Sequence, residues 1–106
     1  MSNDIEEVVF HIIGFAGTAK GLAYEALAKA EEGDFEGASK LLSEADENFE
    51  EAHKVQTSII RDEVDGEKIE FSLLLIHAQD HLMTALEARN LIEKMIRMYK
   101  QIKKVW

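Results

Sequence analysis

Hydrophobic and small residues recur at steps of three and four along the first third of the chain. They are Ile5, Val8, Val9, Ile12, Ile13, Ala16, Ala19, Ala23, Ala26, Leu27 and Ala30. This spacing places them on one face of an α-helix over about seven turns. A polar residue among positions 2–4 can cap its start, while Gly33 and Asp34 are typical of a helix end followed by a new N-cap. We therefore expect a first helix over about residues 4–32.

The same periodicity continues in two further segments. The second includes Phe35, Ala38, Leu41, Leu42, Ala45, Phe49, Ala52, Val55, Gln56, Ile59 and Ile60. The acidic, glycine-containing stretch RDEVDGEK predicts its end, which gives helices over about residues 35–61 and 68–103. Three long helices joined by short turns predict an all-α, antiparallel three-helix bundle, formed by one domain over residues 1–106.

The third helix carries apolar residues nearly all round. One face has Leu73, His77, Asp80, His81, Thr84, Ala88, Leu91 and Met95, and Leu75, Ile76, Leu82, Met83 and Leu86 cover much of the opposite side. In a lone three-helix bundle each helix keeps one face toward water, so this pattern predicts that a second subunit covers the helix. A parallel assembly with cyclic symmetry brings three copies of the helix together, as a homotrimer.

Composition excludes several kinds of function. The 106 residues include 46% hydrophobic and 31% charged residues, no proline and no cysteine, and carry a formal net charge of -9. An acidic chain is a poor partner for nucleic acid, and the lack of cysteine removes thiolate nucleophiles and cysteine metal sites. No segment resembles a signal peptide or is apolar enough to insert in a membrane, so we expect a cytoplasmic protein.

The segment HAQDH places chemically active side chains in this apolar helix. His77 and His81 lie one turn apart, as in HExxH metal sites, but the glutamate of that motif is missing and the spacing alone is a weak signal. Together with Asp80 and Thr84 they form a polar stripe, and a buried polar group left unpaired costs about 1–3 kcal/mol. The stripe therefore indicates function. Gln79 lies about 200° round the helix from His77, so it cannot easily serve its own site but could reach a neighbouring subunit's site.

Histidine chemistry favours phosphoryl transfer at this stripe. A neutral imidazole is a nucleophile near pH 7 that can attack phosphorus and hold the phosphoryl group, here on His77. A second imidazole, His81, can donate a hydrogen bond to the phosphoryl oxygens. Three Asp80 carboxylates meeting on a threefold axis would repel by about 4 kcal/mol per pair at 4 Å and an effective dielectric of 20. Either a proton or a cation must then intervene, and a cluster of oxygen ligands suits a hard divalent ion such as Mg²⁺.

The segments HAQDHLMT, FSLLLI, AHKVQTSII and AKAEEGDFEGA resemble the lactose/cellobiose-type enzyme IIA proteins of the bacterial phosphoenolpyruvate-dependent sugar phosphotransferase system. The resemblance covers roughly residues 5–103. It implies a homotrimeric phosphocarrier that takes a phosphoryl group from the phosphocarrier HPr on His77 and passes it to a cysteine of the cognate enzyme IIB. It also implies that Gln79 and His81 line the phosphorylation site and that Asp80 binds a divalent metal at the trimer axis.

Several residues outside the motif have more than one interpretation. Gly14, Gly17 and Gly21 weaken the first helix, and we favour close helix packing over space beside the active histidine as the reason. His53 is interpreted as a core or interface histidine rather than a second phosphorylation site, and His11 as structural. The methionines Met83, Met95 and Met98 are either ordinary packing residues or part of an apolar patch that faces a partner.

Two other functions are compatible with parts of the sequence. The first two helices have the pattern of a TPR-like or MIT-like helical hairpin, which predicts a non-catalytic interaction module, although no second copy of the unit follows. A metalloenzyme that uses His77 and His81 as ligands lacks a clear third ligand and a general base. Phosphorylation of His77 would separate a phosphocarrier from the interaction module, and Zn²⁺ bound at the two histidines would favour the metalloenzyme.

Overall fold

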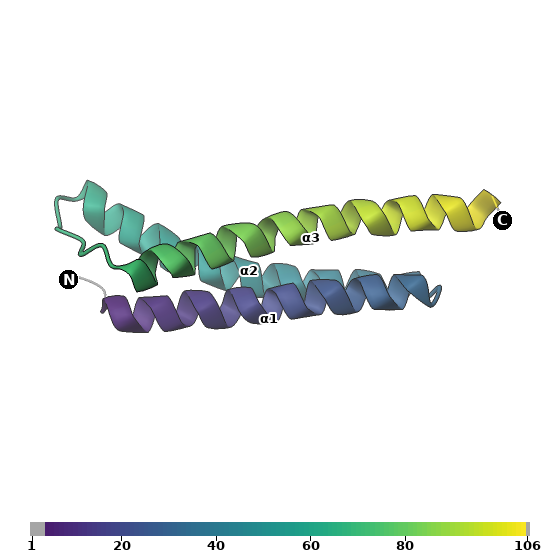
Figure 1. The fold of residues 1–106 in the computed structure, drawn as a ribbon, viewed down its shortest axis with the longest axis horizontal. Coiled ribbons are helices and arrows are strands. Elements are labelled where there is room, and N and C mark those ends of the chain that lie inside the picture. Colours follow the sequence, from purple (N-terminus) through teal and green to yellow (C-terminus); the bar gives the residue numbers. More distant parts are fainter. Residues whose placement is uncertain (1–3, 106) are drawn as a thin grey trace.

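The protein is an elongated bundle of three long helices. The computed structural model describes residues 4–105, with the side chain of Val105 left aside. The helices are α1 (Ile5–Glu31), α2 (Phe35–Val64) and α3 (Leu73–Val105), and the molecule measures 57 × 21 × 16 Å. Helices α1 and α3 run in the same direction and α2 runs back between them in the chain order (Figure 1). The predicted all-α, three-helix architecture is confirmed.

The start of α1 and the connection from α1 to α2 are formed by the capping residues that the sequence predicts. Asp4 is the N-cap of α1, and its side chain accepts a hydrogen bond of 3.1 Å from the backbone N–H of Glu6; residues 2 and 3, the other candidates, lie outside the described residues. Gly33 has a φ of +87°, the left-handed region that favours glycine after a helix end. Asp34 then caps α2 by accepting a 2.9 Å hydrogen bond from Gly37 N–H.

The connection between α2 and α3 differs from the sequence prediction. Helix α2 continues to Val64 rather than 61, and α3 begins at Leu73 rather than near 68. The reason is a cap that the hydrophobic pattern did not reveal. The Ser72 hydroxyl accepts a 3.1 Å hydrogen bond from Leu75 N–H, and the Ser72 carbonyl accepts another of 3.1 Å from Ile76 N–H. The residues before it, 67–72, form a non-helical strap.

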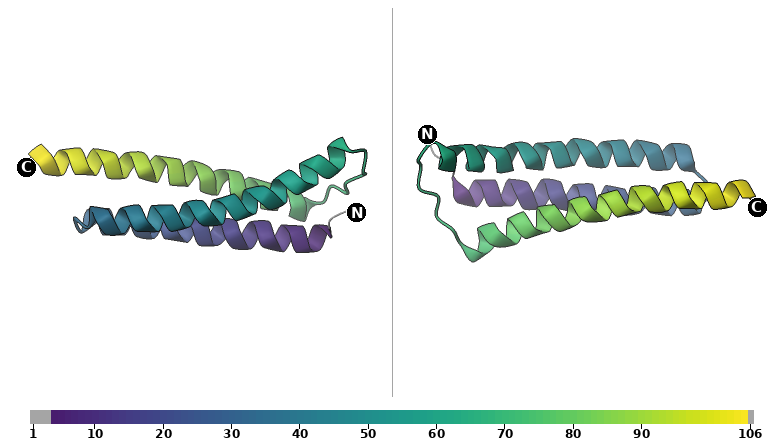
Figure 2. Two further views of the ribbon diagram at one scale, coloured as in Figure 1. Left: turned by 180° about the vertical axis from the view of Figure 1, so that it is seen from behind. Right: turned by 90° about the horizontal axis from the view of Figure 1, so that it is seen from above.

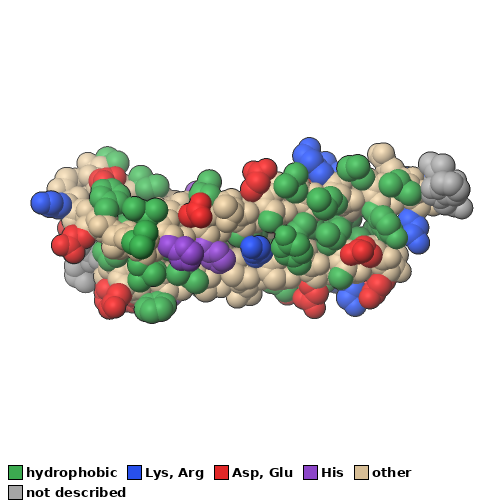
Figure 3. Space-filling view, in the orientation of Figure 1, with side chains coloured by type: hydrophobic (Ala, Val, Ile, Leu, Met, Phe, Trp, Pro, Cys, Tyr) green, Lys and Arg blue, Asp and Glu red, His purple; other side chains and the backbone are tan. Residues whose placement is uncertain are grey.

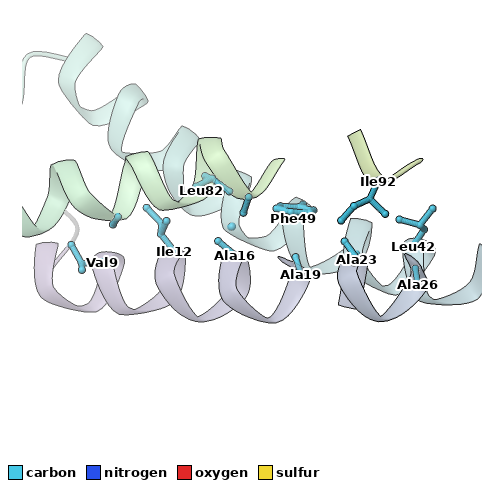
Figure 4. Close-up of a cluster of buried hydrophobic side chains, with 14 of the residues drawn as sticks. Val9, Ile12, Ala16, Ala19, Ala23, Ala26, Leu42, Phe49, Leu82 and Ile92 are labelled. Carbon is cyan, nitrogen blue, oxygen red and sulfur yellow. The ribbon is translucent and has the colours of Figure 1, made fainter. Parts of the chain in front are cut away.

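Helix α1 forms the centre of the core because its inner face is built from small residues. Ala16, Ala19, Ala23 and Ala26 are fully buried, and they face the larger side chains of Leu42, Phe49, Leu82 and Ile92 (Figure 4). Short alanine side chains let both neighbouring helices pack close to α1. By contrast, α2 and α3 contact each other little and diverge toward the strap that joins them (Figure 2).

Helix α3 buries only one side against the rest of the chain. That side consists of Leu75, Ala78, Leu82, Ala85, Ile92 and Ile96. Ile76 and Met83 are exposed by about half in the single chain, so the prediction that another subunit covers them stays a prediction. We use the name outer face for the exposed apolar residues Leu73, Ile76, Met83, Leu91, Met95, Met98 and Ile102. Among the described helices, none is long and apolar enough to cross a membrane.

Candidate functional site

The two histidines of the HAQDH segment lie on α3 where it borders α1. Their rings are nearly parallel, at 14°, with centroids 6.4 Å apart, as expected for positions one turn apart. His77 is exposed and His81 is half-buried. The histidine side chains lie together at the boundary between α3 and α1 in the space-filling view (Figure 3). The fold therefore presents one ring to solvent and supports the second against a neighbouring helix.

The polar stripe is not buried within the single chain, where His77, Asp80 and Thr84 are exposed. Its predicted burial depends on a second subunit and stays a prediction. The Thr84 hydroxyl is bound within its own helix, where it donates to the carbonyls of Asp80 at 2.9 Å and His81 at 3.2 Å. It is therefore not aimed at a ligand between the two rings.

Gly17 of α1 lies directly beside His81. A Cβ at this position would stand 3.7 Å from His81 Nε2, whereas a Cβ at Gly14 or Gly21 would meet nothing within 4 Å. The favoured interpretation, close helix packing, is therefore wrong for this chain at Gly14 and Gly21. The other interpretation, space beside the active histidine, holds at Gly17 only in a changed form, because the neighbouring ring is His81 and not His77. The absence of a side chain there keeps the approach to the His81 ring open.

An apolar hollow adjoins His77 at the start of α3. It has a volume of about 500 Å³ and is lined by Leu73, Leu74 and His77. Leu73 is 84% exposed, although leucine normally lies inside a protein. Exposed apolar side chains clustered around a polar functional group are typical of a surface that binds another protein. The surroundings of His77 thus suit a macromolecular partner better than a small charged ligand alone.

Gln79 lies on the opposite flank of α3 from His77, as the two-residue spacing predicts. Its side chain is half-buried, and its Oε1 accepts a 2.6 Å hydrogen bond from Gln56 Nε2 of α2. Sequence reasoning included Gln56 only as one position of a hydrophobic face and missed this contact. The sequence did contain a signal for this contact. Gln56 is a polar amide at a position of the helical pattern where an apolar side chain is expected, which indicates a hydrogen-bond partner on a neighbouring helix.

Asp80 points away from the bundle core. Its carboxylate makes no hydrogen bond or ion pair within residues 4–105, so its oxygens are available to a cation. No group of three potential metal-ligating side chains occurs in this part of the chain, so one copy does not supply a metal site by itself. The predicted site at Asp80 depends on further copies of the helix and stays a prediction.

The remaining histidines lie apart from this site. His53 on α2 is exposed, so its interpretation as a core histidine is wrong, while a place in an interface stays a prediction. His11 is also exposed, with its ring centroid 6.2 Å from that of Phe15. Met83, Met95 and Met98 are 48–62% exposed on the outer face, which agrees with the interpretation as an apolar patch rather than ordinary packing.

Comparison with known proteins places this geometry in one family. The lactose/cellobiose-specific IIA subunits of the phosphotransferase system match the chain over residues 7–100. The lichenan-specific phosphotransferase enzyme IIA component of Bacillus subtilis is 41% identical over 102 residues, which cover 96% of this chain and 93% of that protein.

Solved structures extend the comparison to the fold. The crystal structure of the cellobiose-specific enzyme IIA from Bacillus anthracis is 40% identical, with a TM-score of 0.92 over 98% of this chain and 95% of that one. The IIA(chitobiose)–HPr complex of the Escherichia coli phosphotransferase system contains a chain that is 39% identical, with a TM-score of 0.80 over 96% of this chain and 99% of that one.

Proposed function

Because the chain belongs to the lactose/cellobiose-specific IIA subunits of the phosphotransferase system, we propose that it carries a phosphoryl group on His77. The observation that carries this assignment is the exposed His77 ring beside an apolar hollow, with His81 one turn further along. His77 takes the group from HPr and passes it to a cysteine of the cognate enzyme IIB during sugar uptake. The transfer takes place in the cytoplasm.

The reaction requires little more than an accessible imidazole. An unprotonated ring nitrogen of His77 attacks the phosphorus of a phosphohistidine on HPr, and the new N–P bond forms as the donor's N–P bond breaks. In the second transfer a thiolate of enzyme IIB attacks the same phosphorus, an S–P bond forms, and His77 is released. HPr as the donor is supported by the similar IIA chain that was solved in complex with HPr.

His81 assists by donating a hydrogen bond to the phosphoryl oxygens. The centroids of the two rings are 6.4 Å apart, which is too far for a direct stacking contact. The His81 ring is therefore free to interact with the phosphoryl oxygens instead of with His77. A protonated or neutral imidazole N–H there offsets negative charge that moves with the phosphoryl group. Gly17 supports this role because no side chain crowds His81 Nε2 from the α1 side.

The site is completed by assembly of three copies through the outer face. On α3 the outer face lies between the flank that carries His77 and the flank that carries Gln79, about 200° apart. In a cyclic assembly the first flank of one copy therefore meets the second flank of the next. This arrangement supports Gln79 as a residue that lines the neighbouring copy's phosphorylation site.

Asp80 is proposed to bind a divalent cation, Mg²⁺ or a similar ion, at the axis of this assembly. The residue fits such a role because its carboxylate is exposed on the outer face side of α3 and has no partner within residues 4–105. Carboxylate oxygens are the ligands that hard divalent ions prefer. The ion would neutralise the carboxylates of three copies and so stabilise the trimer.

The two other functions are less well supported. The hairpin on which a non-catalytic interaction module was based lies inside the family match at residues 7–100. The metalloenzyme requires a third ligand beside His77 and His81, and the described part of the chain offers none.

The decisive experiment measures phosphorylation of histidine variants. Incubation with radiolabelled phosphoenolpyruvate, enzyme I and HPr should place one acid-labile phosphoryl group on each wild-type chain. His77→Ala should abolish the label, and His53→Ala and His11→Ala, which change two other exposed histidines, should keep it. His81→Ala should slow labelling by roughly 10- to 100-fold without abolishing it. Stoichiometric, acid-labile labelling of the His77→Ala protein would remove the assignment.

A further inference from the structure

A single amide contact ties α2 to α3 beside the proposed site. The Nε2 of Gln56 donates to the Oε1 of Gln79 over 2.6 Å, and both side chains are half-buried. The two helices otherwise contact each other little and diverge toward the strap (Figure 2). Gln79 also borders a hollow of about 170 Å³ with Ile59, Ile60 and Ile76, so its amide is open on one side.

The direction of this hydrogen bond determines what Gln79 can offer. With its oxygen turned toward Gln56, the side chain has both N–H bonds of its amide left for another acceptor. If the amide turned over, the oxygen would face outward instead. A phosphoryl group carries only acceptor oxygens, so it is attracted by the first arrangement and repelled by the second.

The position of Gln79 on α3 allows its amide to contact a phosphoryl group bound to a neighbouring copy of the chain. Gln79 and His77 are two residues apart, which is about 200° round the helix and about 3 Å along it. In a cyclic assembly through the outer face, Gln79 therefore stands opposite the partner copy's active histidine at nearly the same height. No other described side chain is hydrogen-bonded to the Gln79 amide.

We infer that Gln56 is a positioning residue, which holds Gln79 with its amide N–H bonds directed at the phosphoryl group on the neighbouring subunit. The inference rests on the proposed function, because it presupposes a phosphoryl group on His77. It gives α2 a part in phosphoryl transfer, although α2 carries no residue of the HAQDH motif. Gln56 itself touches neither the donor nor the phosphoryl group.

Two substitutions of Gln56 separate positioning from a merely structural tie. Gln56→Glu has the same shape but only acceptor oxygens, so Gln79 must turn its N–H bonds inward and its oxygen toward the phosphoryl group. Gln56→Met removes the hydrogen bond and leaves Gln79 free to adopt either orientation. Positioning therefore predicts that the glutamate variant is slower than the methionine variant. A structural tie predicts the reverse, because glutamate keeps a hydrogen bond between the helices.

The measured quantity is the rate of phosphoryl transfer from phosphorylated HPr under single-turnover conditions. We expect about a tenfold loss for Gln56→Glu, a smaller loss for Gln56→Met, and no change for Gln101→Glu, which adds the same charge at an exposed glutamine. Thermal midpoints and molar masses of all variants are compared alongside. Equal rates for all three, or a slower methionine variant, would overturn the inference.

Mixed oligomers test whether Gln56 acts on its own chain or on the next. Gln56→Glu chains supply His77, and His77→Ala chains supply an intact Gln56–Gln79 pair. Positioning across the interface predicts that mixing restores fast transfer to a fraction of the sites, whereas an effect within one chain leaves every site slow. Labelling of the His77→Ala protein alone tests the proposed function. If that protein is still labelled, the proposed function fails; if it is not labelled but mixing leaves every site slow, only the inference about Gln56 fails.

Discussion

His77 and His81 are one turn apart on the same helix, yet the fold gives them different surroundings. The His77 ring stands in solvent beside exposed leucines, and the His81 ring lies half-buried beside Gly17 of α1. An exposed ring can meet the donor and the acceptor protein in turn, and a supported ring can hold an oxygen in a constant place. The difference in environment therefore agrees with the proposed roles, in which His77 accepts the phosphoryl group and His81 assists.

Arg89 of α3 forms ion pairs with one carboxylate of α2 and one of its own helix. Its guanidinium donates to both carboxylate oxygens of Asp46, through Nε at 2.7 Å and Nη2 at 2.8 Å, and to Glu93 at 3.2 Å. The hydrogen bond to Asp46 raises the pKa of Arg89; partial burial opposes this effect, and the bond to Glu93 adds to it. Arg89 is only 15% exposed, so this bridge between α3 and α2 is better shielded from water than an ordinary surface ion pair.

Replacing Arg89 should therefore destabilise the protein measurably. We expect Arg89→Met to lower the free energy of unfolding by about 1–2 kcal/mol, because two charge-assisted hydrogen bonds to Asp46 are lost. Arg97→Met is the matched control, since Arg97 is 69% exposed and makes one 3.4 Å contact with Glu93. Its effect should stay within about 0.5 kcal/mol. Urea unfolding at one fixed protomer concentration measures both, and equal losses would contradict the bridge.

Helix α3 begins where a backbone cap forms rather than where its hydrophobic pattern begins. Residues 68–71 contain Ile69 and Phe71, which fit a helical pattern, but the chain stays non-helical until Ser72. The Ser72 hydroxyl satisfies the N–H of Leu75, one of the amides that a helix start leaves unpaired. This cap places the first turn of α3, and so the apolar hollow beside His77, at its observed position.

Removing the Ser72 hydroxyl should loosen this turn. We expect Ser72→Ala to lower the free energy of unfolding by about 1 kcal/mol, and to speed amide hydrogen exchange at Leu75. Ser43→Ala is the control, because Ser43 is an exposed residue inside α2 where alanine is a slightly better helix former. Unchanged exchange at Leu75 in the Ser72 variant would show that the cap does not hold the helix start.

The whole molecule leaves a long apolar face uncovered. The seven residues of the outer face extend from Leu73 to Ile102 along α3, and each side chain is between 48% and 84% exposed. Many exposed apolar side chains on one side of a helix are unfavourable for a monomer in water, and exposed apolar patches are typical of protein interfaces. Burying them between copies of α3 is the reason we expect a homotrimer.

A charge in the middle of this face should break the assembly. We expect Leu91→Glu to turn the trimer into monomers, because three glutamates would be forced together in an apolar interface. Val64→Glu is the control, since Val64 is 79% exposed at the end of α2 and lies away from the outer face. Light scattering after size exclusion measures the molar mass. A Leu91→Glu protein that remains trimeric would contradict an interface at this face.

The proposed ion at Asp80 makes a separate prediction for the assembly. Chelation by EDTA should weaken the wild-type trimer, because it leaves three carboxylates close together without a counterion. Asp80→Ala should make the trimer insensitive to the chelator. Sedimentation of dilute protein with and without EDTA gives the dissociation constants. If EDTA leaves the dissociation constant of the wild-type trimer unchanged, the proposed ion at Asp80 is contradicted.

The sequence by itself determined the features that depend on neighbouring residues. Helical periodicity, the glycine after α1 and the Asp34 cap involve positions at most four residues apart, so they can be read without a structure. The one-turn spacing of His77 and His81 follows from the same local geometry. The family resemblance likewise depends on short segments of sequence, and the comparisons confirm it over residues 7–100.

Only the tertiary structure decided which of these residues meet. The contact between Gln56 and Gln79 joins positions 23 apart, and the bridge between Asp46 and Arg89 joins positions 43 apart. Periodicity assigns a residue to a face, but not to a partner on another helix. Exposure also depends on the packing of whole helices, which leaves His77, Asp80 and Thr84 at the surface of the single chain and His81 half-buried. The sequence singled out His77 as the proposed phosphoryl acceptor, and the packing of α1, α2 and α3 determined its surroundings.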